Sequence, residues 1–281
     1  MSMKDKVFSP CGSLDGKTVL FVGNSFTFFG DCVLRTTRNG IDNGYFYRVA
    51  ESYGDRVTVT NCTYGGYSFY HIPWQKYAGK ELLTLILALH PNHYGNKDGA
   101  EIDPFYLQDY VVLQQSGMPI PETYDDARAI MALFPPETQF LFYVTTHDVF
   151  GNLEPTLAAA ETLRSEGVGY IPLGQMLNDV WNGKASVPGA TLPMNKNSFI
   201  IDGKDQYHPN CLTGLITAIM TYCAITGAKA KIDDTSFVST ELTHYFNGPT
   251  NFPEILSSKE TMRGLCTLVD RYIAQYNPER G

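Results

Sequence analysis

The chain has 281 residues, of which 43% are hydrophobic, 13% aromatic and 18% charged. This composition excludes intrinsic disorder, collagen and coiled coils, and the length suffices for a large hydrophobic core. The net charge is −8 and Lys and Arg form no runs, so duplex nucleic acid and anionic membrane surfaces are not expected as partners, because both select a basic surface. The longest apolar stretch, residues 82–89, is far shorter than the ~20 residues that span a bilayer.

Apolar runs typical of buried strands alternate with helical segments along the chain. The pattern predicts, in chain order, a strand at 17–23, a helix at 46–53, a strand at 56–62, a helix at 81–90, a strand at 110–114, a helix at 125–134, a strand at 139–145, a helix at 154–166, a strand at 168–173 and a buried helix at 212–226. Such alternation predicts an α/β fold: one domain, 1–281, built as a three-layer α/β/α sandwich around a five-stranded, mainly parallel, flavodoxin-like sheet. The pattern does not place the carboxyl-terminal segment after residue 226.

The amino-terminal residues 1–10 carry Lys4, Asp5 and Lys6 and lack the apolar segment of a secretory signal, so a cytoplasmic protein is expected; an export signal removed beforehand would leave the same sequence. The six cysteines are scattered, and none belongs to a C-x-x-C pair. In a chain of this size that spacing is typical of reduced thiols, not of a disulfide framework.

A serine follows directly after the first predicted strand, in the segment Gly23-Asn24-Ser25-Phe26-Thr27. Ligands of parallel α/β sheets bind beyond the carboxyl ends of the strands, so Ser25 stands where chemistry is expected. Its hydroxyl is a candidate nucleophile, and its backbone N–H is a candidate donor to a developing oxyanion. The structural alternative is that Ser25 only caps the next helix.

A histidine and two carboxylates lie close together near the far end of the chain, within residues 200–210 (IIDGKDQYHPN). The spacing of Asp205 and His208 allows the carboxylate to meet the imidazole Nδ1–H and leaves Nε2 free as a base. The order Ser, Asp, His is one of those found for such triads. Asp202 is a rival orienting carboxylate, and a solvated surface loop is the structural alternative.

Glycines and amides at the ends of the next two strands are candidate oxyanion donors. Gly65 and Gly66 lack a Cβ, so their N–H groups can approach a substrate, although paired glycines also make tight turns. Gln114 and Gln115 each carry a donating NH₂ group. Alternation along a strand sends the two glutamines to opposite faces, so at most one is expected to point into the site, and Gln114 is favoured.

Four segments in this order resemble the sequence blocks of the SGNH (GDSL-like) hydrolases, in particular a bacterial branch with a GNSF-type first block that is often described as a domain of unknown function. They are Gly23-Asn24-Ser25-Phe26-Thr27, Tyr64-Gly65-Gly66-Tyr67-Ser68, residues 109–116 (DYVVLQQS) and Asp205-Gln206-Tyr207-His208-Pro209. The resemblance covers about residues 17–226. Most of the family has Gly-x-Asn-Asp in the third block, whereas Gln114 or Gln115 stands at the amide position here.

The resemblance implies a serine ester hydrolase with Ser25, Asp205 and His208 as catalytic residues and no metal or organic cofactor. It also implies small acyl esters as substrates, with O-acetyl groups on carbohydrate favoured. Four further side chains near the strand ends are candidates for substrate contact: Asn24, His71, Gln115 and His147. His90 and His93 form a lone H-x-x-H pair without a third ligand, so no metal site is expected.

Other functions remain open on the sequence. A carbohydrate-binding protein without catalytic activity could use the same fold. A protein that binds phosphate esters or nucleotides is disfavoured, because the GxxxxGK[ST] loop is lacking. Acyl transfer in place of hydrolysis would use the same residues. The sequence does not address the acyl group, the alcohol or the oligomeric state.

Overall fold

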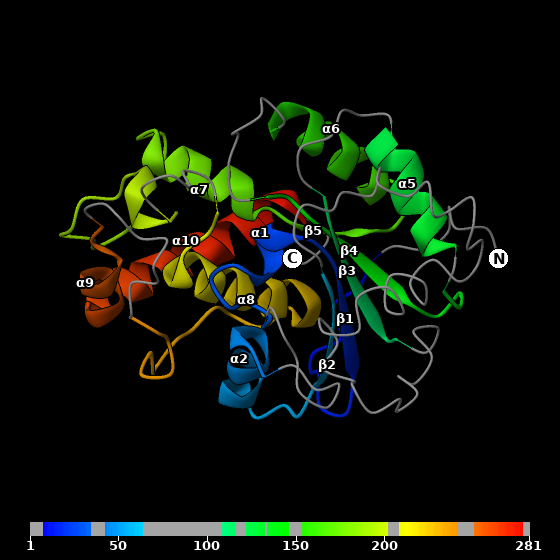
Figure 1. The fold of residues 1–281 in the computed structure, drawn as a ribbon, viewed down its shortest axis with the longest axis horizontal. Coiled ribbons are helices and arrows are strands. Elements are labelled where there is room, and N and C mark those ends of the chain that lie inside the picture. Colours follow the sequence, from blue (N-terminus) through cyan, green and yellow to red (C-terminus); the bar gives the residue numbers. More distant parts are fainter. Residues whose placement is uncertain are drawn as a thin grey trace.

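The structure is a computed structural model that describes residues 8–34, 43–63, 108–115, 122–132, 134–145, 153–201, 208–240 and 250–277. Within these ranges, five strands form one sheet: β1 (Thr18–Gly23), β2 (Thr58–Thr63), β3 (Tyr110–Gln114), β4 (Gln139–Tyr143) and β5 (Gly169–Ile171). They lie in the order β2-β1-β3-β4-β5, and every pairing between them is parallel (Figure 1). This is the flavodoxin-like order, so the predicted fold class is confirmed.

Helices cover both faces of the sheet. The described helices are α1 (Ser25–Phe28), α2 (Tyr45–Tyr53), α5 (Glu122–Met131), α6 (Leu153–Arg164), α7 (Leu173–Trp181), α8 (Cys211–Thr226), α9 (Phe252–Ser257) and α10 (Lys259–Tyr276), with a short 3₁₀ helix, η6 (Lys196–Ser198). One hydrophobic cluster joins the sheet to α5 and α6, and the other joins it to α2, α7, α8, α9 and α10. The strands therefore contribute alternate residues to two cores, as a sheet buried on both faces requires.

The central helix of the larger layer is α8, and its position follows from its composition. All of its residues are buried, which explains why the segment is apolar on every side. Asn210 caps its amino end by accepting a hydrogen bond from the Thr213 N–H at 3.1 Å. Gly227 ends the helix with a φ of +79°, in the left-handed region that glycine enters without a steric penalty. The sequence prediction for this helix is confirmed.

The carboxyl-terminal segment, unplaced on the sequence, packs onto the larger layer through α9 and α10 (Figure 1). Helix α10 lies against α8, and the Tyr272 hydroxyl donates to Asp179 Oδ2 on α7 at 2.6 Å. Asn277 then borders β5: its Oδ1 accepts from the Tyr170 N–H at 3.2 Å and its Nδ2 donates to the Tyr170 carbonyl at 3.0 Å. The Asn277 side chain therefore forms hydrogen bonds with the backbone N–H and C=O of Tyr170, which are the kind of groups that an edge strand otherwise leaves unpaired.

Several predicted elements differ in extent from those observed, and in two of them prolines explain the difference. The fifth strand was predicted to reach residue 173 but ends at Ile171, because Pro172 follows it and α7 begins at Leu173. The helix predicted at 125–134 runs from Glu122 to Met131 and ends before the prolines at 135 and 136, which disfavour helical backbone at the residue before them. The helix predicted at 81–90 lies outside the described residues.

A buried carboxylate joins the chain before β1 to α8. Asp55 accepts hydrogen bonds from the Ser13 hydroxyl at 2.7 Å, the Leu14 N–H at 2.5 Å and the Tyr222 hydroxyl at 2.8 Å. Burial raises the pKa of Asp55, but these three hydrogen bonds favour the charged form and together hold its pKa below the ordinary value. The ionised carboxylate therefore stabilises the folded state.

Replacing Asp55 with Asn is expected to lower the free energy of unfolding by about 2 kcal/mol at pH 7, because the amide NH₂ cannot accept the hydrogen bonds that Oδ2 accepts. Since the pKa of Asp55 is lowered on folding, its contribution is present above the unfolded-state pKa of about 4 and is lost as the pH falls through the folded-state pKa. Urea unfolding at pH 7 and at pH 3 measures both effects. If the free energies of unfolding of wild type and Asp55→Asn differ by the same amount at both pH values, this account is wrong. The control is Asp125→Asn, which makes the same change at an exposed position on α5.

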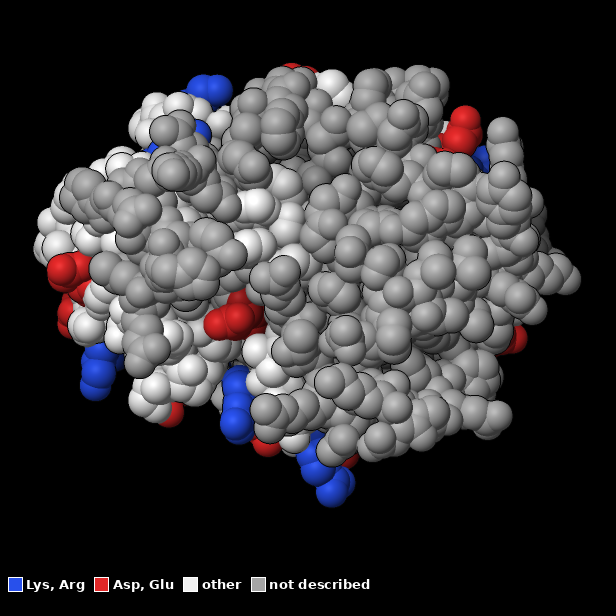
Figure 2. Space-filling view, in the orientation of Figure 1, with Lys and Arg blue, Asp and Glu red and all other residues white. Residues whose placement is uncertain are grey.

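None of the described helices is long and apolar enough to cross a lipid bilayer. Figure 2 shows one face of the molecule, on which the Lys and Arg side chains of the described residues are interspersed among Asp and Glu, mostly near the outline but with one acidic group nearer the middle.

Candidate active site

Ser25 is the first residue of α1, directly after the turn that follows β1. Asn24 has an extended backbone and caps the helix: its Oδ1 accepts from the Phe26 N–H at 3.0 Å. The alternative that Ser25 itself caps the helix is therefore wrong, because the neighbouring asparagine takes that role. The Ser25 N–H is one of the first amides of α1, which the helix itself cannot satisfy. Both the hydroxyl and this N–H remain at the carboxyl end of β1.

Gln114, the last residue of β3, fixes this turn from the neighbouring strand. Its Oε1 accepts from the Asn24 N–H at 2.9 Å and from the Thr27 hydroxyl at 2.8 Å. Gly23 makes the approach possible, because a Cβ at this position would lie 2.6 Å from Gln114 Oε1. The Gln114 Nε2 is buried and has no hydrogen-bond partner among the residues that the structure describes. A buried NH₂ group without an acceptor is costly, so this donor is available to an oxygen of a ligand.

The Ser25 hydroxyl and the His208 imidazole meet, although 183 positions separate the two residues. Ser25 Oγ lies 2.7 Å from His208 Nε2, within hydrogen-bond distance. Ser25 is 8% exposed and His208 is half-buried, so the pair lies at the edge of the core. When the ring proton is on Nδ1, Nε2 accepts the hydrogen bond from the hydroxyl and is placed to take its proton.

Backbone pairing fixes His208 just before α8. The Ile201 N–H donates to the His208 carbonyl at 2.8 Å, and Ile200 forms an antiparallel bridge with Pro209. Asn210 extends this anchor, because its Nδ2 donates to the Ser198 carbonyl at 2.9 Å. These contacts hold His208 beside Ile201 and at the amino end of α8.

A direct backbone contact joins the α1 turn to the amino end of α8. A Cβ on Gly214 would lie 1.7 Å from the Gly30 carbonyl oxygen, and a Cβ on Gly30 would lie 2.3 Å from the Asn210 carbonyl oxygen. Gly30 also has a φ of +81°, in the left-handed region. The two glycines therefore allow the segments that carry Ser25 and His208 to pack at backbone distance.

Two phenylalanines of the α1 segment contact the imidazole. The Phe29 ring is stacked on the His208 ring, with centroids 4.2 Å apart and planes inclined by 22°. The Phe26 ring lies 5.3 Å away with an inclination of 37°. The sequence alone does not place these rings beside His208. The spacing of three residues between Phe26 and Phe29 predicts only that the two rings lie on one side of a helical turn.

Two ionisable groups near this backbone contact, Asp31 and Cys211, have raised pKa values. Burial raises the pKa of the Asp31 carboxyl above its ordinary value. Burial, and then the neighbouring Asp31, raise the pKa of the Cys211 thiol to about 11. A thiol needs a lowered pKa to act as a nucleophile at neutral pH. Cys211, three residues after His208, is therefore a poor competitor for the role proposed for Ser25.

The structure places five of the predicted site residues and leaves the other five outside the described ranges. Ser25, Asn24, Gln114 and His208 come together at the carboxyl ends of β1 and β3, with the Asn24 side chain engaged in capping α1. Gln115 is buried after β3. The predicted residues that lie outside the described ranges are Gly65, Gly66, His71, His147 and Asp205, together with the rival carboxylate Asp202.

A separate hollow of about 640 Å³ lies at the opposite end of the sheet. Its walls include Phe134 and Phe140 at the amino end of β4 and Val168 before β5. It shares no described residue with the Ser25–His208 pair, and it takes no part in the site.

The search against family models found no match, and no curated protein matched the sequence. Among solved structures, the chain resembles a DUF4886 family protein from Bacteroides uniformis, with a TM-score of 0.53, 15% identity and coverage of 92% of this chain and 94% of that chain. It also resembles a variant of Axe2, an acetyl xylan esterase from Geobacillus stearothermophilus, with a TM-score of 0.51, 12% identity and coverage of 80% of this chain and 100% of that chain.

The chain has the SGNH hydrolase fold. The resemblance to the SGNH hydrolases read from the four sequence blocks is thereby supported. In the flavodoxin-like order, β1 and β3 are adjacent and their connections run to opposite sides, so a crevice forms at their carboxyl ends. Ser25 follows β1 and Gln114 ends β3. The SGNH fold therefore brings the Ser25 hydroxyl and the Gln114 side-chain NH₂ to the position where such sheets bind ligands.

Proposed function

We propose that this protein is a serine ester hydrolase that acts through an acyl-enzyme on small acyl esters, with O-acetyl groups on carbohydrate as the favoured substrates. The observation that carries the proposal is the 2.7 Å contact between Ser25 Oγ and His208 Nε2 at the carboxyl end of β1. A nucleophile and a base within hydrogen-bond distance are the minimal unit of this chemistry. The fold shared with an acetyl xylan esterase supports the choice of substrate class.

In the acylation step, His208 Nε2 takes the proton of Ser25 as Oγ attacks the ester carbonyl carbon. The new Oγ–C bond forms as the carbonyl π electrons move to oxygen, which gives a tetrahedral oxyanion. When this intermediate collapses, the bond to the alcohol oxygen breaks, and the alcohol leaves with the proton from Nε2. Water then repeats the sequence on the acyl-enzyme, releasing the carboxylic acid and restoring Ser25.

Three kinds of donor are proposed for the oxyanion: the Ser25 N–H, the Gln114 Nε2 and an N–H of Gly65 or Gly66. One such donor typically stabilises the transition state by about 3 kcal/mol. The unpaired, buried Nε2 supports Gln114, since an oxyanion would supply the acceptor that this group lacks. Asp205 is proposed to accept the Nδ1–H of His208 and so to fix the tautomer that leaves Nε2 free.

The test is hydrolysis of p-nitrophenyl acetate by wild type and by Ser25→Ala, with the folding of both followed by circular dichroism. Turnover by wild type that is lost in Ser25→Ala supports the proposal and justifies a screen of acetylated sugars. Equal activity in the two proteins, or none in either, would contradict it. Saturable glycan binding that survives Ser25→Ala without turnover would favour a carbohydrate-binding protein.

A further inference from the structure

The imidazole of His208 is stacked on a ring that the acyl-enzyme mechanism above does not use. Phe29 presents its face to the His208 ring, with 4.2 Å between centroids and planes within 22° of parallel. The Phe26 ring is farther away, at 5.3 Å, and more tilted. Among the described phenylalanines, Phe29 is therefore the one whose π face meets the imidazole.

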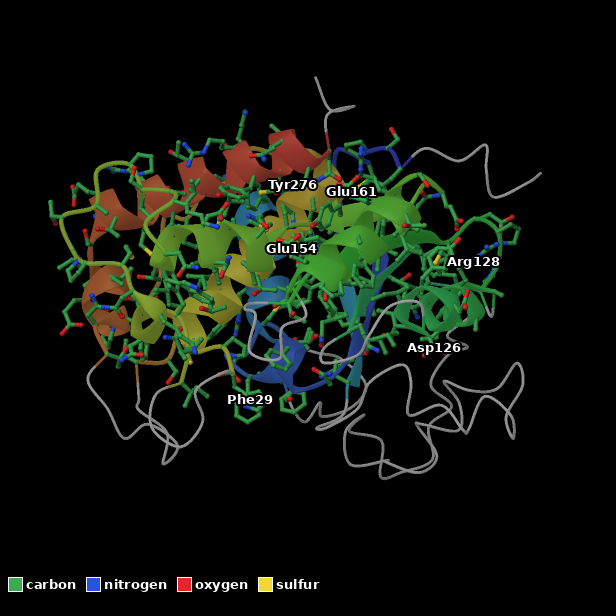
Figure 3. The ribbon with its side chains drawn as sticks, turned by 90° about the horizontal axis from the view of Figure 1, so that it is seen from above. Phe29, Asp126, Arg128, Glu154, Glu161 and Tyr276 are labelled. Carbon is green, nitrogen blue, oxygen red and sulfur yellow. The ribbon has the colours of Figure 1, made fainter. Side chains whose placement is uncertain are left out.

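Contacts of Phe29 and of the next residue hold this segment in place. The Phe29 N–H donates to the Ser25 carbonyl at 2.9 Å, which closes the single turn of α1. The Phe29 ring is stacked on that of Phe28, a core residue only 3% exposed, with centroids 5.3 Å apart. Gly30, the next residue, packs against the backbone of α8. Figure 3 shows Phe29 at the edge of the described residues, pointing away from the packed helices.

We propose that Phe29 is a positioning residue that holds the imidazole toward Ser25 and stabilises its protonated form through the face of the phenyl ring. This rests on the proposed function, in which His208 gains a proton only as Ser25 attacks. The face of an aromatic ring carries negative partial charge and attracts a cation within about 6 Å. Because the imidazolium forms on the reaction path and is absent from the resting enzyme, the attraction favours the transition state over the ground state and raises kcat.

Substitutions at Phe29 separate an aromatic role from a simple packing role. Phe29→Leu removes the π face and is expected to lower kcat about tenfold, with KM within about twofold of wild type. Phe29→Tyr keeps the face and should retain kcat within about twofold. A Phe29→Leu variant with wild-type kcat would overturn the proposal.

Fluorination isolates the electrostatic part, because fluorine withdraws charge from the ring face with little change in ring size. Replacing Phe29 with mono-, di- and trifluorinated phenylalanine should lower kcat stepwise for p-nitrophenyl acetate. The same analogues at Phe134, which packs against Phe140 at the far end of the sheet, are the control and should leave kcat unchanged.

The outcomes distinguish this inference from the proposed function. Turnover that depends on Ser25 but is insensitive to fluorination at Phe29 overturns the inference and leaves the esterase intact. Turnover that falls with each added fluorine at Phe29 and stays constant at Phe134 supports both. Wild-type protein without turnover overturns the proposed function, and the inference with it.

Discussion

Replacing His208 with alanine is expected to lower kcat for p-nitrophenyl acetate by about 10³-fold or more, while the protein remains folded. In the structure, Nε2 is the nitrogen that faces Ser25 Oγ, at 2.7 Å. Without it the hydroxyl keeps its proton and is a weak nucleophile at neutral pH. The backbone that anchors this position does not depend on the imidazole, since the Ile201 N–H bonds to the carbonyl of residue 208.

Steady-state kinetics and circular dichroism of His208→Ala measure this effect directly. His93→Ala, which removes a histidine not assigned to the site, is the matched control and should retain wild-type kcat. An unchanged kcat in folded His208→Ala would exclude the proposed triad. A loss of similar size in Ser25→Ala, and no further loss in the double variant, is the pattern expected of two residues that act as a unit.

The second large effect concerns the carboxylate that orients His208. Asp205→Asn is expected to lower kcat by about 10²- to 10⁴-fold. An amide at this position can stabilise the tautomer of His208 that carries its proton on Nε2, and in that tautomer Nε2 cannot act as a base. Asp202→Asn is expected to lower kcat less than about fivefold. Both residues belong to the sequence segment between Ile201 and His208, and they lie outside the described residues.

The two variants form a matched pair, since they make the same chemical change at positions three residues apart in the sequence. Their kcat values, measured side by side with thermal unfolding to confirm folding, identify the orienting residue. A larger loss in Asp202→Asn than in Asp205→Asn would show that the D-x-x-H assignment is wrong.

The elements most accurately predicted from sequence are those encoded by local signals. The β1 and β3 runs are rich in buried β-branched and aromatic residues. Helix α8 is apolar on every side and ends at a glycine with positive φ. The α10 helix shows the other case: its apolar residues have helical spacing, but its packing against α8 and β5 depends on surfaces formed by the rest of the chain. The same holds for Asn277, whose amide borders the edge of β5.

At the candidate site, residue types and their order along the chain were sufficient to select Ser25, Gln114 and His208 and to predict the parallel sheet that carries two of them. Their spatial relationship depends on contacts between distant segments. Gly30 and Gly214 allow the α1 and α8 segments to approach each other. The Gln114 side chain, at the end of β3, accepts a hydrogen bond from the backbone N–H of Asn24, which follows the adjacent strand β1. The Phe29 ring stacks on the His208 ring. Local propensity encodes each strand or helix, whereas these distances arise only when both partners are packed in one core.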